Sequence, residues 1–292
     1  MYTHETCPIC EGIKFESFLK AVDYTVSQDT FQIVKCISCG FHFTNPIPDE
    51  DKIGDYYKSE SYISHSSTNR GLINKIYQRV RKHTLKQKLK LVKKWAKGDN
   101  VMDIGAGTGH FLSTCQKAGF NVLGLEPDQD ARRFAETHLN VKLQPTEELY
   151  DLGHNSKDII TMWHVLEHVY HLKKDVKQIS KVLKDDGTLI VAVPNMGSFD
   201  AQHYGAHWAA YDLPIHLYHF QPKDIANLFD RVNMEVVAIL PMKFDSYYVS
   251  LLSEKYKDGN MARAFWNGWR SNVKAKNDSY SSQIYILKKK GK

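Results

Sequence analysis

The stretch that decides the fold is Val101-Met102-Asp103-Ile104-Gly105-Ala106-Gly107-Thr108-Gly109. An apolar run typical of a buried strand reaches an aspartate, and three glycines then alternate with other residues before a helical pattern opens at His110. Glycines at the end of a strand leave backbone N–H groups exposed and let a ligand approach without interference from a Cβ atom. The G-x-G-x-G spacing differs from the G-x-G-x-x-G of dinucleotide-binding folds, and the motif alone is weak evidence for any one ligand.

Seven apolar runs separated by helical patterns follow one another from residue 99 onward. Their ranges are 101–104, 122–126, 141–143, 158–163, 182–195 (a helix end and a turn, then the strand), 234–240 and 283–287. This alternation is typical of an α/β fold, in which helices cover both faces of a parallel sheet. We therefore predict a Rossmann-like sheet that is seven-stranded and mostly parallel.

An acidic residue, Glu126, ends the second of these strands about twenty residues after the glycines. A carboxylate at that place can accept hydrogen bonds from both ribose hydroxyls of a nucleoside. More than one class of cofactor carries such a ribose. Glu126 therefore predicts a nucleoside cofactor without deciding which one.

Four of the five cysteines form two C-x2-C pairs, Cys7 with Cys10 and Cys36 with Cys39, with 25 residues between the pairs. Two such knuckles can surround a tetrahedral ion with thiolates, which is the zinc-ribbon arrangement. A cytosolic chain does not normally keep two disulfides, so we favour thiolate–metal bonding over free thiols or a redox pair. All four cysteines would be ligands, which predicts a structural zinc and not a catalytic one.

The basic residues are concentrated in one segment. Residues 70–97 hold eleven Lys or Arg and no Asp or Glu, so the rest of this chain of net charge +6 carries −5. Apolar residues recur through the segment at helical spacing, which predicts an amphipathic basic helix with at most one break. Its charged face is either solvated surface or a patch for an anionic partner. Three tyrosines precede the basic segment: Tyr56, Tyr57 and Tyr62. They either pack at the surface or at a domain boundary, or form a lid over the cofactor pocket.

The composition is that of an ordinary globular protein, with 42% hydrophobic and 25% charged residues. No stretch of about 18 consecutive apolar residues is present to cross a membrane. The first residues lack the basic and then apolar pattern of a secretory signal. We therefore expect a cytoplasmic protein that does not insert into membranes. The oligomeric state cannot be predicted from the sequence.

Several motifs together resemble the class I S-adenosylmethionine-dependent methyltransferases. They are Asp103-x-Gly105-x-Gly107-x-Gly109, Glu126, the run D-I-I-T-M-W-H-V-L-E-H-V at 158–169, and L-K-x-x-G-x-L before V-P-N within 183–195. The match spans about residues 98–240 and is most similar to ubiquinone-pathway O-methyltransferases and to bacterial sugar and surface-glycan methyltransferases. The cysteine module resembles that of bacterial deoxysugar methyltransferases. Those carry a further C-terminal domain that 292 residues do not accommodate, so their substrates and reaction type are not carried over.

The resemblance implies roles for residues around the glycine turn. Asp103 would bind the amino end of the methionine moiety, and Glu126, followed by Pro127, would hold the ribose. The cofactor would pass close to the backbone of Gly105, Ala106 and Gly107. Thr146 would lie at the edge of the adenine, and Trp163 would line the sulfonium side. The implied cofactor is S-adenosylmethionine.

An oxygen acceptor needs its proton removed, and histidine is the usual base near neutral pH. The candidates are His164 and His168 after the fourth strand and His216 in the following insertion. H-x-x-E-H is also a metalloprotease motif, but its place after this strand argues against hydrolysis. Glu167-His168 resembles the Glu-His pair of the ubiquinone-type enzymes, which faces the substrate and can assist a divalent ion. Each histidine taken singly could instead be a hydrogen-bonded structural residue.

Two aromatic-rich insertions, 197–220 and 242–280, follow the fifth and sixth strands. Connections at the carboxyl ends of such strands form ligand sites, so we expect these insertions to form the acceptor lid. Aromatic side chains suit sugars, flat rings or bases. The predicted organisation is a zinc-ribbon-like module at 1–45, a helical connector at 46–97 and a methyltransferase domain at 98–292.

The sequence thus predicts a methyltransferase for a small-molecule or glycan acceptor, such as an anionic nucleotide-sugar, with oxygen favoured over carbon or nitrogen. The first alternative is an RNA methyltransferase that binds nucleic acid through the cysteine module and the basic helix. The modest charge of that module argues against this alternative, because an RNA clamp should be basic there too. The second alternative is a non-enzymatic binding module that kept the cofactor fold.

Overall fold

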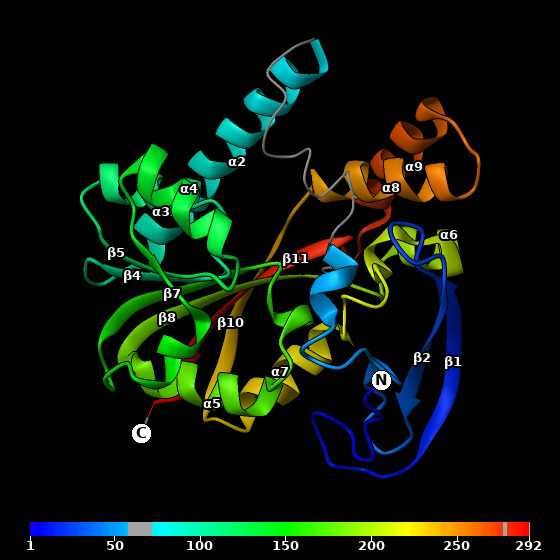
Figure 1. The fold of residues 1–292 in the computed structure, drawn as a ribbon, viewed down its shortest axis with the longest axis horizontal. Helices are drawn as coiled ribbons and strands as arrows, with labels where there is room; N and C mark the ends of the chain where they lie inside the picture. The colour runs from blue at the N-terminus through cyan, green and yellow to red at the C-terminus, as the bar shows by residue number, and fades with distance from the viewer. Residues whose placement is uncertain (58–71, 277–278, 292) are drawn as a thin grey trace.

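The computed structural model of the chain describes residues 1–57, 72–276 and 279–291, and its main element is a seven-stranded sheet (Figure 1). The strands lie in the order β10 (Met234–Pro241), β11 (Ser282–Lys289), β8 (Leu183–Pro194), β7 (Lys157–Trp163), β4 (Asn100–Ile104), β5 (Asn121–Leu125) and β6 (Leu143–Gln144). Strands β8, β7, β4, β5 and β6 are parallel, whereas β11 runs antiparallel between β8 and β10. The predicted seven-stranded, mostly parallel α/β fold is confirmed.

Helices cover both faces of this sheet because apolar side chains alternate between the faces along each strand. Met102 and Ile160 belong to the core on one face, and their neighbours Val101 and Ile159 belong to the core on the other. The helices of the first face are α5 (Leu172–Val182) and α7 (Pro222–Asp230); those of the second are α2 (Leu72–Trp95), α3 (His110–Lys117) and α4 (Gln129–Leu139). The carboxyl ends of the parallel strands therefore meet at one edge between two helical layers.

The predicted basic helix is the single uninterrupted helix α2. Val92 is buried against the sheet, and Leu85 and Leu89 pack beside it. Tyr62 and the first two residues of the predicted basic segment, 70 and 71, lie outside the described residues. Among the helices that the structure describes, none has the length and apolar character needed to span a bilayer.

A second, four-stranded antiparallel sheet joins the amino-terminal module to the insertion after β8. Its strands are β1 (Phe15–Val22), β2 (Thr30–Cys36), β3 (His42–Thr44) and β9 (Tyr218–His219), in that order. Strand β9 comes from the insertion 197–220, so Phe43 of the module pairs with Tyr218 across about 175 residues of chain. The module is therefore part of the same hydrogen-bonded structure as the insertion.

Most aromatic side chains of that insertion are buried. Tyr204, Trp208 and Tyr211 pack in one core with Phe31 and Ile33 of the module. The short elements of the insertion are α6 (Phe199–Tyr204), η4 (Gly205–His207) and η5 (Ala209–Tyr211). Three further short helices are η1 (Ile53–Tyr57), η2 (Thr146–Tyr150) and η3 (Leu166–His168). The first insertion is thus the packing partner of the module as well as a neighbour of the sheet edge.

The insertion after β10 forms a helical hairpin. Its helices are α8 (Asp245–Tyr256) and α9 (Met261–Lys274), and the chain then returns into the sheet as β11. Figure 1 shows this hairpin at an outer corner of the molecule, on the side toward which α2 projects.

Candidate active site

The glycine turn between β4 and α3 is built from left-handed residues. Gly105, Gly107 and Gly109 have φ values of 69°, 52° and 76°, which glycine adopts at no steric cost. A Cβ atom at Gly105 would lie 2.3 Å from Val165 Cγ2, and one at Gly109 would lie 2.9 Å from Ala135 Cβ. At Gly107, by contrast, no described atom lies within 4 Å of that position. Gly105 and Gly109 therefore serve the packing of the protein, and Gly107 faces space that a ligand can occupy.

Glu126 follows β5 and bends its carboxylate toward this turn. Its two oxygens accept hydrogen bonds from the backbone N–H groups of Gly107 (2.7 Å) and Asp128 (3.0 Å). The residue is only 8% exposed. Pro127 next to it is exposed, and Thr146, at the start of η2, is half-buried. Strands β5 and β6 are neighbours in the sheet, which brings these three residues to one end of it.

Asp103 lies near the end of β4 and is buried. Its Oδ1 accepts a hydrogen bond of 2.5 Å from the hydroxyl of Thr161 on β7. Burial raises the pKa of Asp103 to about 7, although the Thr161 hydroxyl and the charge of Lys88 act in the opposite direction. The carboxyl group is therefore close to the balance between its two protonation states at neutral pH.

Lys88 of α2 reaches into the same site, which the sequence interpretation did not single out. Its Nζ lies 4.4 Å from the centroid of the Trp163 ring and 6.0 Å from that of Phe111. Burial lowers the pKa of Lys88, and the charges of Asp103 and Asp245 oppose that shift. A signal was available in the sequence, because Lys88 lies three residues after Leu85 and four before Val92, on the apolar stripe of the helix. A lysine on such a stripe points inward, not to solvent.

His164 follows Trp163 with a φ of +58° and binds two carboxylates. Its Nε2 lies 2.9 Å from Asp245 Oδ2 at the start of α8, and its Nδ1 lies 3.4 Å from Glu167 Oε1. Burial would lower the pKa of His164, but these two carboxylates outweigh it and raise the pKa to about 10. An imidazolium has no lone pair that can accept a proton, so this arrangement suits a positioning role for His164.

His168 and His216 lie together, with their rings 4.5 Å apart and nearly perpendicular. Nδ1 of His168 is 3.0 Å from the carbonyl oxygen of Ile215, and Nδ1 of His216 is 2.9 Å from that of Ala210. A carbonyl oxygen only accepts, so Nδ1 carries the proton in both rings. The Nε2 lone pairs of both histidines are consequently left to act as bases or as metal ligands.

Other side chains surround this pair. The hydroxyl of Tyr57 in η1 lies 2.9 Å from His168 Nδ1. Glu167 is completely buried, and its carboxylate contacts His164 Nδ1 at 3.4 Å. One ligand atom each of Glu167, His168 and His216 lie within 4.8 Å of one another. Burial and the neighbouring His216 lower the pKa of His168 to about 4, so that ring is neutral at pH 7.

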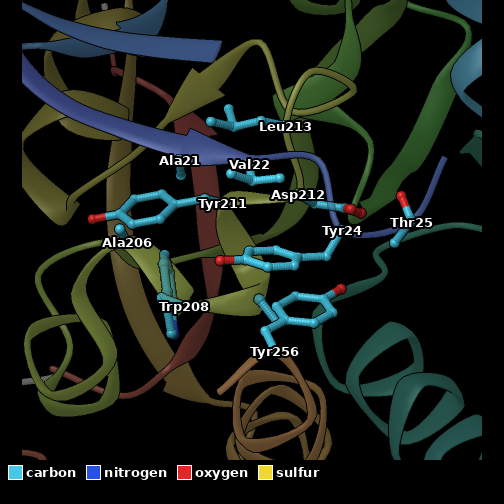
Figure 2. A pocket seen from close by; sticks show the side chains of 11 residues that line it. Ala21, Val22, Tyr24, Thr25, Ala206, Trp208, Tyr211, Asp212, Leu213 and Tyr256 are labelled. Carbon is cyan, nitrogen blue, oxygen red and sulfur yellow. The ribbon is translucent and has the colours of Figure 1, made fainter. Parts of the chain in front are cut away.

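An aromatic pocket, whose lining side chains Figure 2 shows, is linked to the histidine pair through Asp212. Tyr24 of the module and Tyr256 of α8 stack with ring centroids 4.3 Å apart, and Trp208 and Tyr211 line the same space. Asp212 also lines it, and its Oδ2 is 4.0 Å from His216 Nε2. The cavity has a volume of about 10 Å³, which is enough for about one water molecule. Tyr24 and Tyr256 would have to separate before a larger molecule could enter.

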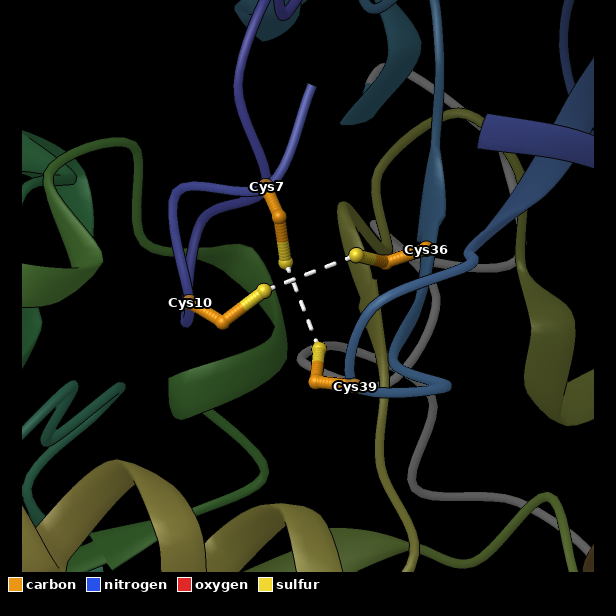
Figure 3. A group of neighbouring side chains, drawn as sticks. All are labelled: Cys7, Cys10, Cys36 and Cys39. Atoms are coloured by element: carbon orange, nitrogen blue, oxygen red, sulfur yellow. Dashed lines mark hydrogen bonds between the residues drawn. The ribbon is translucent and has the colours of Figure 1, made fainter. Parts of the chain in front are cut away.

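The four cysteines form the candidate metal centre, and their side chains point toward one another (Figure 3). The Sγ atoms of Cys7 and Cys39 are 3.7 Å apart, those of Cys10 and Cys36 are 3.5 Å apart, and all four lie within 4.8 Å of one another. Four thiolates at about 2.3 Å from a tetrahedral zinc ion have neighbouring sulfurs about 3.8 Å apart. The chemistry and spacing of this donor set therefore fit zinc.

Comparison with known proteins points to one family. A family model described as a methyltransferase domain matches residues 75–239. The ubiquinone biosynthesis O-methyltransferase of Idiomarina loihiensis is 26% identical over 177 residues, which cover 56% of this chain and 72% of that protein. The enzyme of the same name from Actinobacillus pleuropneumoniae is 27% identical over 177 residues, which cover 54% and 73%. A SAM-dependent methyltransferase from Archaeoglobus fulgidus shares the fold, with a TM-score of 0.51 at 16% identity over 72% of this chain and 94% of that one.

Proposed function

Because the chain belongs to this family of methyltransferase domains, we propose that it transfers a methyl group to a hydroxyl oxygen of a small-molecule or glycan acceptor. The protein is an S-adenosylmethionine-dependent methyltransferase, as the family match and the fold show. The preference for oxygen is the proposed part. Its main support is the pair His168 and His216. Backbone carbonyls of the insertion accept from Nδ1–H of each ring, which leaves the Nε2 lone pair to accept a proton. The similarity to O-methyltransferases adds to it.

The residues at the glycine turn fit the cofactor. Gly107 leaves the space that a cofactor needs, and the turn beside it is fixed because the N–H groups of Gly105 and Ala106 both donate to the carbonyl oxygen of Leu125. When bound, S-adenosylmethionine supplies an electrophilic methyl group on a sulfonium ion. We infer that Asp103 accepts a hydrogen bond from the methionine ammonium group, directly or through water. Glu126 would exchange its backbone partners for the two ribose hydroxyls.

Other side chains complete this binding site. Lys88, held between Asp103 and the Trp163 ring, is placed to pair with the methionine carboxylate. The Trp163 ring would then face the sulfonium ion, which an aromatic face attracts. Thr146 and Pro127, at the ends of β6 and β5, would border the nucleoside.

Binding of S-adenosylhomocysteine is expected to weaken as the pH falls below 7. Burial raises the pKa of Asp103 to about 7, and only its carboxylate form can accept a hydrogen bond from the ligand ammonium group. Below that pH, binding must release a proton, so the affinity falls by at most about tenfold per pH unit. Calorimetric titration between about pH 5 and pH 8 measures the slope. Asp103→Asn should bind more weakly and show no such slope, whereas a flat wild-type profile would contradict the proposed ionisation.

The chemistry needs one proton transfer. For an oxygen acceptor, Nε2 of His168 or His216 would take up the hydroxyl proton as the oxygen attacks the methyl group that bound S-adenosylmethionine would supply. The buried carboxylate of Glu167 would stabilise the imidazolium that results. The same three groups could instead hold a divalent ion, which would favour the deprotonated acceptor. Loss of activity on chelation, restored by Mg²⁺ or Mn²⁺, would identify that second arrangement.

Replacing the base is expected to lower turnover without weakening cofactor binding. General base catalysis contributes about 10²–10⁴-fold, so the His168→Ala or His216→Ala variant should lose turnover in that range. The measurement is methyl transfer to a panel of acceptors that starts with nucleotide-sugars. The exposed His154 supplies the matched control, His154→Ala. Full turnover in both site variants would contradict the assignment of the base.

The panel should include RNA. The exposed basic side chains of α2, such as Lys86 and Lys90, favour an anionic partner. In the module, however, Lys35 is paired with Glu16 at 2.8 Å, and acidic residues outnumber basic ones. RNA binding that weakens steeply with salt, together with methylation of RNA, would replace the small-molecule proposal.

A further inference from the structure

Helix α9 has an unusual distribution of side chains. Its buried face consists of small or polar residues, which are Ala264, Asn267, Gly268 and Ser271. Its exposed residues include large apolar ones, which are Met261, Phe265, Trp266, Trp269 and Val273, exposed by 73%, 68%, 57%, 43% and 60%. A surface helix of a globular protein normally shows the opposite arrangement. Contiguous apolar surface of this kind marks an interaction site.

The packing of the hairpin does not need these large side chains. Its other helix, α8, also presents small residues inward, such as Ser246, Ser250 and Ser253. The two helices approach so closely at Gly268 that a Cβ atom there would lie 2.8 Å from Tyr247 Cα. The Ser246 hydroxyl donates to the Gly268 carbonyl oxygen at 3.0 Å. Small residues thus hold the hairpin together, and the aromatic residues of α9 are left at its surface.

The exposed residues form one continuous patch. Met261, Phe265, Trp269 and Val273 are spaced four apart and follow one stripe of α9. The Trp266 and Trp269 rings stack with centroids 4.9 Å apart. The Phe265 ring lies 5.2 Å from that of Tyr247, so the patch continues onto α8, where Tyr248 and Leu251 are exposed. We call this surface, formed by the exposed residues of α8 and α9, the hairpin patch.

Cationic residues border the hairpin patch. Arg263, Arg270 and Lys274 share one flank of α9, and the last two lie over the Phe199 ring at 5.2 and 4.5 Å. Near the start of α8, the His83 ring of α2 lies 5.6 Å from that of Phe244. Residues 79–95 of α2 contain eight Lys or Arg and no Asp or Glu. The aromatic surface is therefore flanked by positive charge, and α2 projects on the same side of the molecule (Figure 1).

We propose that the hairpin patch binds an anionic membrane surface. Aromatic side chains would enter the headgroup region, and the flanking Lys and Arg side chains would contact lipid phosphates. The charges argue against a second copy of this chain as the occupant. In a symmetric dimer the same basic flanks would face each other and repel. The proposal concerns attachment at the surface and is independent of the acceptor of the methyl group.

Flotation with lipid vesicles tests the proposal on the full chain. Vesicles of phosphatidylglycerol and phosphatidylcholine should carry the wild type, and vesicles of phosphatidylcholine alone should carry much less. Trp266→Ser/Trp269→Ser should lower partitioning at least about tenfold, because two interfacial aromatic anchors are lost. The control is Ile13→Ser, which removes a 73% exposed apolar residue of the module and should change nothing. Salt should weaken binding by the wild type.

Other results would overturn the proposal. These are absence of wild-type binding to the anionic vesicles, or binding that the double variant retains. A concentration-dependent dimer that the double variant abolishes, without vesicle binding, would assign the hairpin patch to a second copy. Calorimetry with S-adenosylhomocysteine should give the same affinity for all variants, which shows that they are folded. It also separates failure of this proposal from failure of the proposed function.

Discussion

Glu126→Ala should weaken the binding of S-adenosylhomocysteine by about 10²-fold or more, since each hydrogen bond to a charged group contributes about 1.5–3 kcal/mol. The variant would lose both proposed contacts with the ribose. It also loses the hydrogen bonds that hold the backbone at Gly107 and Asp128 in place before the ligand arrives. Calorimetric titration of the purified protein measures the effect.

Two companion variants sharpen this experiment. Glu147→Ala removes an exposed acid from η2, near the same end of the sheet, and should bind like the wild type. Glu126→Gln keeps one acceptor oxygen and should fall between the two. Equal affinity of Glu126→Ala and the wild type would show that the ribose is held elsewhere. A folded wild type that binds no S-adenosylhomocysteine would leave the glycine turn without its proposed ligand.

The second large effect is expected at the cysteines. We propose that they hold one structural zinc, and Cys36→Ser should then release it and unfold the module. Removing a structural metal ligand costs several kcal/mol, which predicts a fall in the melting temperature on the order of 10 °C. Metal analysis by mass spectrometry and a thermal scan measure both consequences. Ser38→Ala changes an exposed residue in the same knuckle and should keep both the metal and the stability.

The damage should extend beyond the module. Cys36 ends β2, which pairs with β3, and β3 pairs with β9 of the insertion. The Thr44 hydroxyl also donates to the carbonyl oxygen of His216 at 2.8 Å. Loss of zinc is therefore expected to lower turnover as well. A zinc-free protein with full stability and turnover would contradict the structural role.

The fold could be predicted because its signals are local. The residues of the glycine turn after β4 are close together in the sequence. The same is true of the residues within each apolar strand and within each C-x2-C pair. Strand β9 was not predicted, because its two residues pair with a segment about 175 positions away and carry no periodic pattern. The burial of aromatic residues such as Trp208 was not predicted for the same reason, since the module that covers them is remote in sequence.

The site could be predicted only in part. Asp103 lies near the end of β4 and Glu126 follows β5, and these strands are neighbours, so the proximity of the two residues follows from the pattern of strands. Lys88 was counted with the other charges of α2, and only its place on the apolar stripe distinguishes it. The contacts of His164 with Asp245 and of His168 with Tyr57 join segments far apart in the chain. No spacing rule connects such segments, which is why the three histidines could not be ranked from the sequence.

The pairing of β3 with β9 has a practical consequence for engineering. A chain trimmed to the residues that match the family would lose the partner strand of β9, and with it Tyr57 and the cysteine module. The exposed backbone edge of β9 and the uncovered Trp208 and Tyr211 would then favour aggregation. If this catalytic domain is fused to another protein, the amino-terminal module and residues 197–220 should accordingly be kept together.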